Sequence, residues 1–259
     1  MVRREGPCLV EAELLDDSWV CHAITTRHGG ISPAPFDSLN MGLHTEDAPR
    51  NVLENRKRVC AALNYSPQAW VSGEQVHGVG CHVVTAADAG RGAWAYRSSL
   101  PATDILITQT PGILLVSFYA DCVPVLLADP VRRAVGMAHC GWQGTLAGAA
   151  RFAVQAMSQA FGSAPSDLVA VLGPSIGPCC YEVSAQLARR FQEAFGADAV
   201  LGKQLDLRLA NRRLLAKTGL SSAAIHTAPW CTSCQQDLFF SHRASGGRTG
   251  RMAALIGVR

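Results

Sequence analysis

Apolar runs of strand length, separated by glycine, proline and polar residues, dominate the middle of the chain. The segments 103–129 and 132–140 are rich in β-branched and aromatic residues and are interrupted by turn residues, which predicts consecutive buried β-strands. Shorter runs of the same kind lie at 19–27, 70–86, 167–180 and 222–229. The run 70–86 is broken at its glycines and predicts two short strands, and the run 167–180 predicts one strand followed by a Gly/Pro loop.

Two further apolar runs close the chain. Residues 237–243 and 251–258 flank the glycine-rich segment 244–250, which predicts a β-hairpin.

Amphipathic periodicity predicts helices between the strands. The first covers about 47–63 and has Pro49 in its first turn, where the missing N–H of proline costs nothing. Others are expected at 145–162, 183–196 and 205–219. Because strands and helices are interspersed without a repeat or a low-complexity linker, the sequence predicts one mixed α/β, or α+β, domain spanning 1–259.

Polar residues interrupt the most apolar stretch. Asp121, Cys122, His139 and Cys140 lie in the strand-like segment 118–142, where unsatisfied polar groups would cost several kcal/mol. A partner for these groups is therefore expected inside the fold.

His77 also follows an apolar run. One thiolate and two imidazoles from His77, Cys122 and His139 would suit Zn²⁺ and leave a fourth position open, as in catalytic zinc sites. The alternative is ordinary core packing of a cysteine and hydrogen-bonded histidines.

Two other positions suggest ligand binding. Arg27 lies beside Gly29 and Gly30, so its guanidinium and free backbone N–H groups could gather around phosphate; the alternative is a surface charge next to a turn. Asp121 or Asp104 could orient an imidazole or hold a substrate hydroxyl, or could cap backbone N–H groups.

Four more cysteines form two local pairs. Cys231 and Cys234 make a C-x-x-C, and Cys179 and Cys180 follow a predicted strand. Together they could build a second, four-thiolate metal site. Reduced thiols lining one loop region are the favoured alternative, and a redox C-x-x-C is less favoured because it does not open a helix.

Composition narrows the function classes. The net charge of +3 and the scattered basic residues argue against nucleic-acid binding. No apolar run approaches the roughly 18 residues of a membrane span, and no signal peptide is visible, so we expect a cytoplasmic protein with reduced cysteines. We further expect a monomer that acts on a small-molecule substrate.

Long motifs resemble one known family. Seven segments occur in the order typical of the laccase-domain family: "TTRHGGIS", "GEQVHG", "PATD", "ADCVPVLLADP", "AHCGWQG", "LGPSIGPCCYEV" and "CTSCQQDLFFSHR". Members of this family are labelled polyphenol oxidase, purine nucleoside phosphorylase or peptidoglycan editing factor. The resemblance spans nearly the whole chain. It implies mixed, β-sandwich-like sheets flanked by helices, similar to a toxin-like Cys/His hydrolase fold.

The resemblance also implies a site. Zinc would be bound by His77, Cys122 and His139, with Asp121 as a further catalytic residue. Arg27 and Gln143 would bind substrate. The chain departs from the family motif "HAGWRG" by having Cys140 in place of alanine and Gln143 in place of arginine, so Arg27 is expected to carry more of the anion binding.

The implied activity is phosphorolysis of adenosine, inosine and methylthioadenosine to base and (methylthio)ribose 1-phosphate, together with adenosine deamination. An amidase that edits the peptide of a peptidoglycan precursor, with Cys122 as nucleophile, is the first alternative. A copper polyphenol oxidase is disfavoured, because none of the eight histidines forms an H-x-H pair. A non-enzymatic protein with a vestigial metal site is a further alternative.

Overall fold

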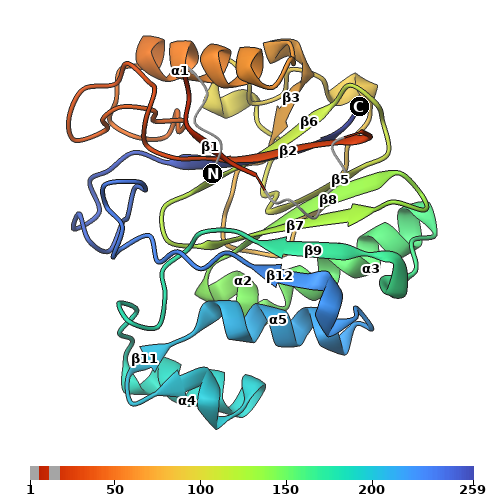
Figure 1. Cartoon of the computed structure of the whole chain (residues 1–259), viewed down its shortest axis with the longest axis vertical. Helices are drawn as coiled ribbons and strands as arrows, with labels where there is room; N and C mark the ends of the chain where they lie inside the picture. Colours follow the sequence, from red (N-terminus) through yellow and green to blue (C-terminus); the bar gives the residue numbers. More distant parts are fainter. Residues whose placement is uncertain (1–5, 12–17) are drawn as a thin grey trace.

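Two β-sheets packed face to face form the centre of the computed structural model, which describes residues 6–11 and 18–259. The first sheet has the order β1-β2-β13-β6-β3 and the second has the order β12-β9-β7-β8-β5-β4. Helices cover the outer face of each sheet, so the layers run helix, sheet, sheet, helix from top to bottom of Figure 1. The sequence prediction of mixed sheets flanked by helices is confirmed.

The five-stranded sheet joins the two ends of the chain to its middle. Its strands are β1 (Leu9–Val10), β2 (Val20–Thr25), β13 (Met252–Val258), β6 (Leu114–Tyr119) and β3 (Trp70–Ser72). The strand β13 pairs antiparallel with both β2 and β6, and β3 runs parallel to β6.

The six-stranded sheet carries the most apolar part of the sequence. Its strands are β12 (Ile225–Thr227), β9 (Val169–Leu172), β7 (Val123–Asp129), β8 (Ala134–Cys140), β5 (Ile105–Thr108) and β4 (Cys81–Val83). A separate ribbon is formed by β10 (Val200–Leu201) and β11 (Gln204–Leu205).

The strand β7 shows why these runs are continuously apolar. Successive side chains of a strand point to opposite faces. Leu126 and Ala128 pack into the core between the sheets, whereas Val125 and Leu127 pack under the helices. Both faces are buried, so no polar alternation is left in the sequence.

The helices lie where the amphipathic pattern placed them. They are α1 (Pro49–Ala62), α2 (Trp142–Ala147), α3 (Ala149–Phe161), α4 (Ala185–Phe195) and α5 (Leu207–Lys217). The helix α1 covers the five-stranded sheet, whereas α3 and α5 cover the six-stranded sheet. The helix expected at 145–162 is divided at Gly148, whose φ of 89° lies in the left-handed region and ends α2.

The predicted C-terminal hairpin is wrong. Residues 237–243 form turns, and the two hydrogen-bonding edges of β13 are occupied by β2 and β6. Phe239 and Phe240 are buried in the core between the sheets, and the carbonyl of Leu238 accepts a hydrogen bond from the Arg27 backbone N–H. The apolar run therefore anchors a loop instead of extending a strand.

No helix in the described part of the chain is long and apolar enough to cross a membrane.

Substitution in the core between the sheets should reduce stability. Leu115 is fully buried there, so we expect Leu115→Ala to lower the free energy of unfolding by about 2–5 kcal/mol, through lost burial and the cavity left behind. Urea denaturation would measure the change. Val131→Ala is a suitable control, because Val131 is 66% exposed and its truncation should change stability by about 0.5 kcal/mol at most.

Candidate active site

Three ligand-type side chains meet at adjacent strand ends of the six-stranded sheet. Cys122 directly precedes β7 and His139 lies near the end of β8; because β7 and β8 are antiparallel, Pro124 pairs with His139 and the two ends are adjacent. His77 comes from the loop between β3 and β4. The ligand atoms of His77, Cys122 and His139 all lie within 4.8 Å of one another.

The carboxylate of Asp104 organises this group. Its Oδ1 accepts a hydrogen bond from His139 Nδ1 at 2.8 Å. The same carboxylate accepts backbone N–H groups from Val76, His77 and Gly78 at 3.1, 3.0 and 2.8 Å. One buried acid therefore fixes both the His139 ring and the loop that carries His77. The sequence had left the role of Asp104 open.

The site favours a thiolate. Burial alone would raise the pKa of Cys122, but the imidazoles of His139 and His77 outweigh it and lower that pKa to about 6. Burial likewise opposes charge on His139, but Cys122 and Asp104 raise its pKa to about 9. Both shifts favour a thiolate–imidazolium pair of Cys122 and His139 in the metal-free protein. Because a metal ligand must be deprotonated, the low pKa of Cys122 also suits metal binding.

Two of the site residues have unusual backbone conformations. His77 and Asp121 have φ angles of 62° and 88°, in the left-handed region that side chains other than glycine rarely adopt. Residues in such conformations persist where the surroundings hold them, and they cluster at functional sites. For His77 the hold is the Asp104 carboxylate, and for Asp121 it comes from the hydrogen bonds of its own side chain.

Gly141 allows the close approach. A Cβ at this position would lie 2.9 Å from Cys122 Sγ and 2.9 Å from His77 Cδ2. The sulfur and the imidazole can therefore converge only if residue 141 has no side chain.

The three side chains face a cavity of about 550 Å³. This volume lies within the range of small-molecule sites. Rings and apolar groups of Tyr96, Phe118 and Ile176 line part of the cavity, and Arg243 and Arg251 bring positive charge to it.

The other predicted site residues differ in where they lie and what they contact. Gln143 lines the cavity, as does Asp121. The Asp121 carboxylate, however, accepts hydrogen bonds from Thr232 Oγ1 at 2.6 Å and from the backbone N–H of Arg243 at 2.7 Å. It therefore positions the loop that carries Arg243, and it orients neither imidazole.

Arg27 does not belong to this cavity. Its guanidinium donates to the backbone carbonyls of Asp37 and Gln236, pairs with the Asp37 carboxylate at 3.2 Å, and packs over the ring of Phe240. These contacts hold the guanidinium outside the residues that line the cavity. The expectation that Arg27 carries more of the anion binding stays a prediction.

Sequence reasoning missed the positive charges of the cavity. Arg243 ends the first C-terminal apolar run and Arg251 begins the second, and neither had a local signal beyond lying in the family motif "FFSHR" or after "TG". His44 was also missed. Burial, followed by the charges of Arg251 and Arg56, lowers the pKa of His44 to about 4, so this cavity imidazole is neutral at pH 7.

Comparison with known proteins assigns the family. The family model described as multi-copper polyphenol oxidoreductase laccase matches residues 21–259. This chain belongs to that family. A Geobacillus stearothermophilus protein named purine nucleoside phosphorylase YlmD is 41% identical over 244 residues, which cover 91% of this chain and 89% of the relative. A Deinococcus radiodurans protein named purine nucleoside phosphorylase is 40% identical over 92% of this chain and 89% of its own length.

Solved structures agree with this family assignment. The structure of YlmD from Geobacillus stearothermophilus has a TM-score of 0.94 and 38% identity, covering 100% of this chain and 98% of that one. The resemblance inferred from the sequence motifs is therefore confirmed for family and fold, and the chain belongs to an enzyme family whose curated relatives are named for purine nucleoside phosphorolysis.

Filling the space at Gly141 should disrupt the site. We expect Gly141→Ala to weaken metal binding by about tenfold or more, because the new Cβ displaces the sulfur or the imidazole from a shared centre. Competition against a calibrated chelator would measure the affinity. In Gly78→Ala the nearest atom is 3.5 Å from the new Cβ, so this neighbouring variant should bind metal like the parent. Equal affinity of all three proteins would contradict the proposed crowding.

The thiolate can be tested by alkylation. In metal-stripped protein, Cys122 should react with iodoacetamide along a pH curve with its midpoint near 6, because only the thiolate is nucleophilic and its fraction rises through that pKa. Burial raises the pKa of the fully buried Cys60 to about 11, so this thiol is an internal control that should stay unreacted at pH 7. Site-resolved mass spectrometry would follow both. His139→Ala should move the Cys122 midpoint upward.

Proposed function

We propose that this protein is a zinc-dependent purine nucleoside phosphorylase that accepts adenosine, inosine and methylthioadenosine and also deaminates adenosine. The observation that carries the proposal is the convergence of His77, Cys122 and His139 on one side of a nucleoside-sized cavity. The names of the curated relatives support the phosphorylase reaction.

The donor set fits zinc. Zinc–nitrogen and zinc–sulfur bonds of about 2.0–2.3 Å place tetrahedral ligands roughly 3.3–3.8 Å apart, which the separations below 4.8 Å can meet with small rotations. The hydrogen bond from His139 Nδ1 to Asp104 leaves Nε2 for a metal, an arrangement common around zinc. When bound, zinc would supply a Lewis acid with one open coordination position.

Copper oxidation fits the site less well than zinc. The cavity group offers two imidazoles and one sulfur, whereas a multicopper centre needs many imidazoles, usually delivered by H-x-H pairs that this sequence lacks. The laccase name of the family is therefore not carried into the proposal.

The charges of the cavity suit phosphate. Arg243 and Arg251 line it, and guanidinium groups bind phosphate oxygens with charge-assisted hydrogen bonds. In phosphorolysis a phosphate oxygen bonds to the ribose C1′ while the bond from C1′ to the purine nitrogen breaks. The base leaves with that electron pair and gains a proton. Arginines that hold phosphate beside C1′ would contribute by orientation and by neutralising its charge.

The remaining walls suit a purine. Tyr96 and Phe118 both lie beside His44, with ring centroids 5.5 and 5.8 Å from the centroid of the imidazole. A neutral His44 can donate one hydrogen bond and accept another, as recognition of a base edge requires. We therefore assign the purine to the wall formed by these three rings.

A cysteine amidase is the second candidate. The observation that favours it is the thiolate–imidazolium pair of Cys122 and His139, with Asp104 behind the imidazole, which is the arrangement of a thiol nucleophile and its base. The two functions differ in their metal requirement. A thiol amidase should keep hydrolysing its peptide in excess chelator and stop on alkylation, whereas the zinc phosphorylase should stop in chelator.

Purified protein loaded with zinc should convert each of the three nucleosides, in the presence of phosphate, to free base and the matching ribose 1-phosphate. Chromatography with product identification would measure this, and adenosine should also yield inosine and ammonia. Cys122→Ala and His139→Ala should each lower turnover by about 100-fold or more. Absence of phosphate-dependent base release from all three nucleosides at full zinc occupancy would refute the proposal.

The phosphate site predicts a selective change in KM. Arg251→Gln should raise the KM for phosphate at least about tenfold, because it removes a charged hydrogen-bonding group, and should change the KM for nucleoside less. Arg248→Gln is the matched control, since Arg248 is exposed, pairs with Glu46 and does not line the cavity. Equal effects of Arg251→Gln on both KM values would argue against a phosphate role.

A further inference from the structure

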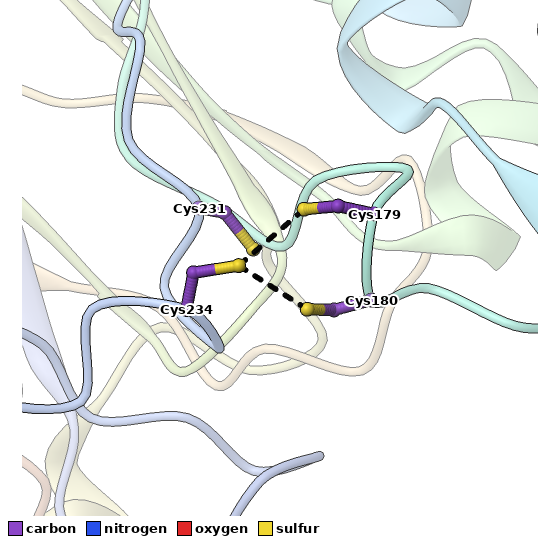
Figure 2. Close-up of side chains that lie close together, drawn as sticks. All are labelled: Cys179, Cys180, Cys231 and Cys234. Carbon is purple, nitrogen blue, oxygen red and sulfur yellow. Dashed lines mark hydrogen bonds between the residues drawn. The ribbon is translucent and has the colours of Figure 1, made fainter.

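A second cluster of metal-ligating side chains lies outside the cavity. Cys179 and Cys180 follow β9, and Cys231 and Cys234 follow β12. Because β9 and β12 are parallel neighbours, both loops leave the sheet at the same edge, and Ser175 continues the pairing with Cys231 as an isolated bridge. Figure 2 shows the four sulfur atoms pointing toward one another from these two loops.

The distances between the sulfur atoms match a tetrahedral metal site. Cys234 Sγ lies 3.5 Å from Cys179 Sγ and 3.4 Å from Cys180 Sγ, and all four sulfurs lie within 4.8 Å of one another. Four thiolates around zinc, each at about 2.3 Å, are about 3.8 Å apart. The sequence left open a choice between a metal site and reduced thiols in one loop region, with the thiols favoured; the convergence of all four sulfurs now favours the metal.

We propose that Cys179, Cys180, Cys231 and Cys234 bind a second zinc ion as a structural tetrathiolate site. A closed site with four protein ligands is the pattern of structural zinc, in contrast to the three ligands and open position in the cavity.

The surroundings of the cluster suit bound thiolates. The backbone N–H of Gly177 donates to Cys231 Sγ at 3.1 Å. Burial opposes ionisation of Cys231, but this donor, the backbone of Cys234 and the neighbouring thiols lower its pKa. The Cys234 thiol forms hydrogen bonds to its neighbouring sulfurs and has a raised pKa, since adjacent sulfurs cannot all ionise together without a cation.

A positive side chain flanks the cluster. The Arg208 guanidinium lies beside Gly177, next to two cysteines of the cluster. A Cβ added to Gly177 would lie 2.9 Å from Arg208 Nη2, 3.2 Å from Cys179 Sγ and 3.3 Å from Cys231 Cβ. The guanidinium also donates to the carbonyl of Ala228 at 3.1 Å, which holds it beside the second loop. One zinc with four thiolates carries two negative charges, so a fixed arginine at this place favours the bound state.

The site would secure one wall of the active cavity. Ile176 and Tyr181, on either side of the first cysteine pair, line that cavity. The N–H of Ile176 donates to the Asp121 carbonyl at 2.9 Å, and Thr232, between the second pair, donates to the Asp121 carboxylate at 2.6 Å. A metal joining the two loops therefore holds both of them against the residue preceding Cys122.

Metal stoichiometry separates the two sites. Protein purified under reducing conditions should contain two zinc ions per chain by elemental analysis. Cys234→Ser should lower the content to one, Cys122→Ser should also lower it to one, and the double variant should contain none. Cys81→Ser is the matched control, because Cys81 is exposed, belongs to neither group and should leave two zinc ions bound.

Spectroscopy identifies the ligands. The Cys122→Ser variant, refilled with Co²⁺, should show the intense sulfur-to-cobalt charge-transfer absorption of a tetrathiolate, and Cys179→Ser in that background should weaken it. Cys179 lies on the other loop of the cluster, so this second variant stays informative if Cys234→Ser does not fold. Two results would overturn the proposal. One is unchanged zinc content in both Cys234→Ser and Cys179→Ser. The other is the detection by mass spectrometry of disulfides between these cysteines in protein purified under reducing conditions. Neither outcome depends on nucleoside turnover, so failure of the proposed enzymatic function is distinguishable.

Discussion

The structure of the site depends on one buried carboxylate. Asp104 is 1% exposed, and isolated burial of its charge would be strongly unfavourable. It is compensated by the His139 imidazole and by three consecutive backbone N–H groups of residues 76–78. These bonds lower the pKa of Asp104 although burial would raise it. The same hydrogen bonds orient the His139 ring and fix the backbone of His77. The Asp104 carboxylate therefore determines both the charge and the geometry of the site.

The sandwich architecture decides where chemistry can be built. The central strands of the two sheets are buried on both faces, which leaves the strand ends and the loops as the places where several polar side chains can converge. His77, Cys122 and His139 occupy one set of ends, and the four loop cysteines occupy another. Asp121 lies between the two groups. It accepts hydrogen bonds from Ile176 in the first cysteine-bearing loop and from Thr232 in the second. The two proposed zinc sites would therefore share one wall of the cavity.

Charge in the cavity comes from distant parts of the chain. Arg243 and Arg251 reach it from the C-terminal segment, where the loop 237–250 is anchored by buried phenylalanines instead of strand pairing. Gln143, which stands where the family motif "HAGWRG" has an arginine, lines the same cavity. Loss of an arginine from one element is thus compatible with anion binding, provided that others line the same space.

The sequence by itself determined the family, the helices and most strands, because long apolar runs and amphipathic periods are local signals. It also offered His77, Cys122 and His139 as a ligand set, with ordinary core packing as the alternative, because all three follow apolar runs. Only the tertiary structure decided that Asp104 orients His139, that Arg27 is occupied by Asp37 and Gln236, and that β13 pairs with β2 and β6. Each of these depends on contacts between residues far apart in the chain. Likewise, two cysteine pairs separated by some fifty residues become one cluster only because β9 and β12 are parallel neighbours.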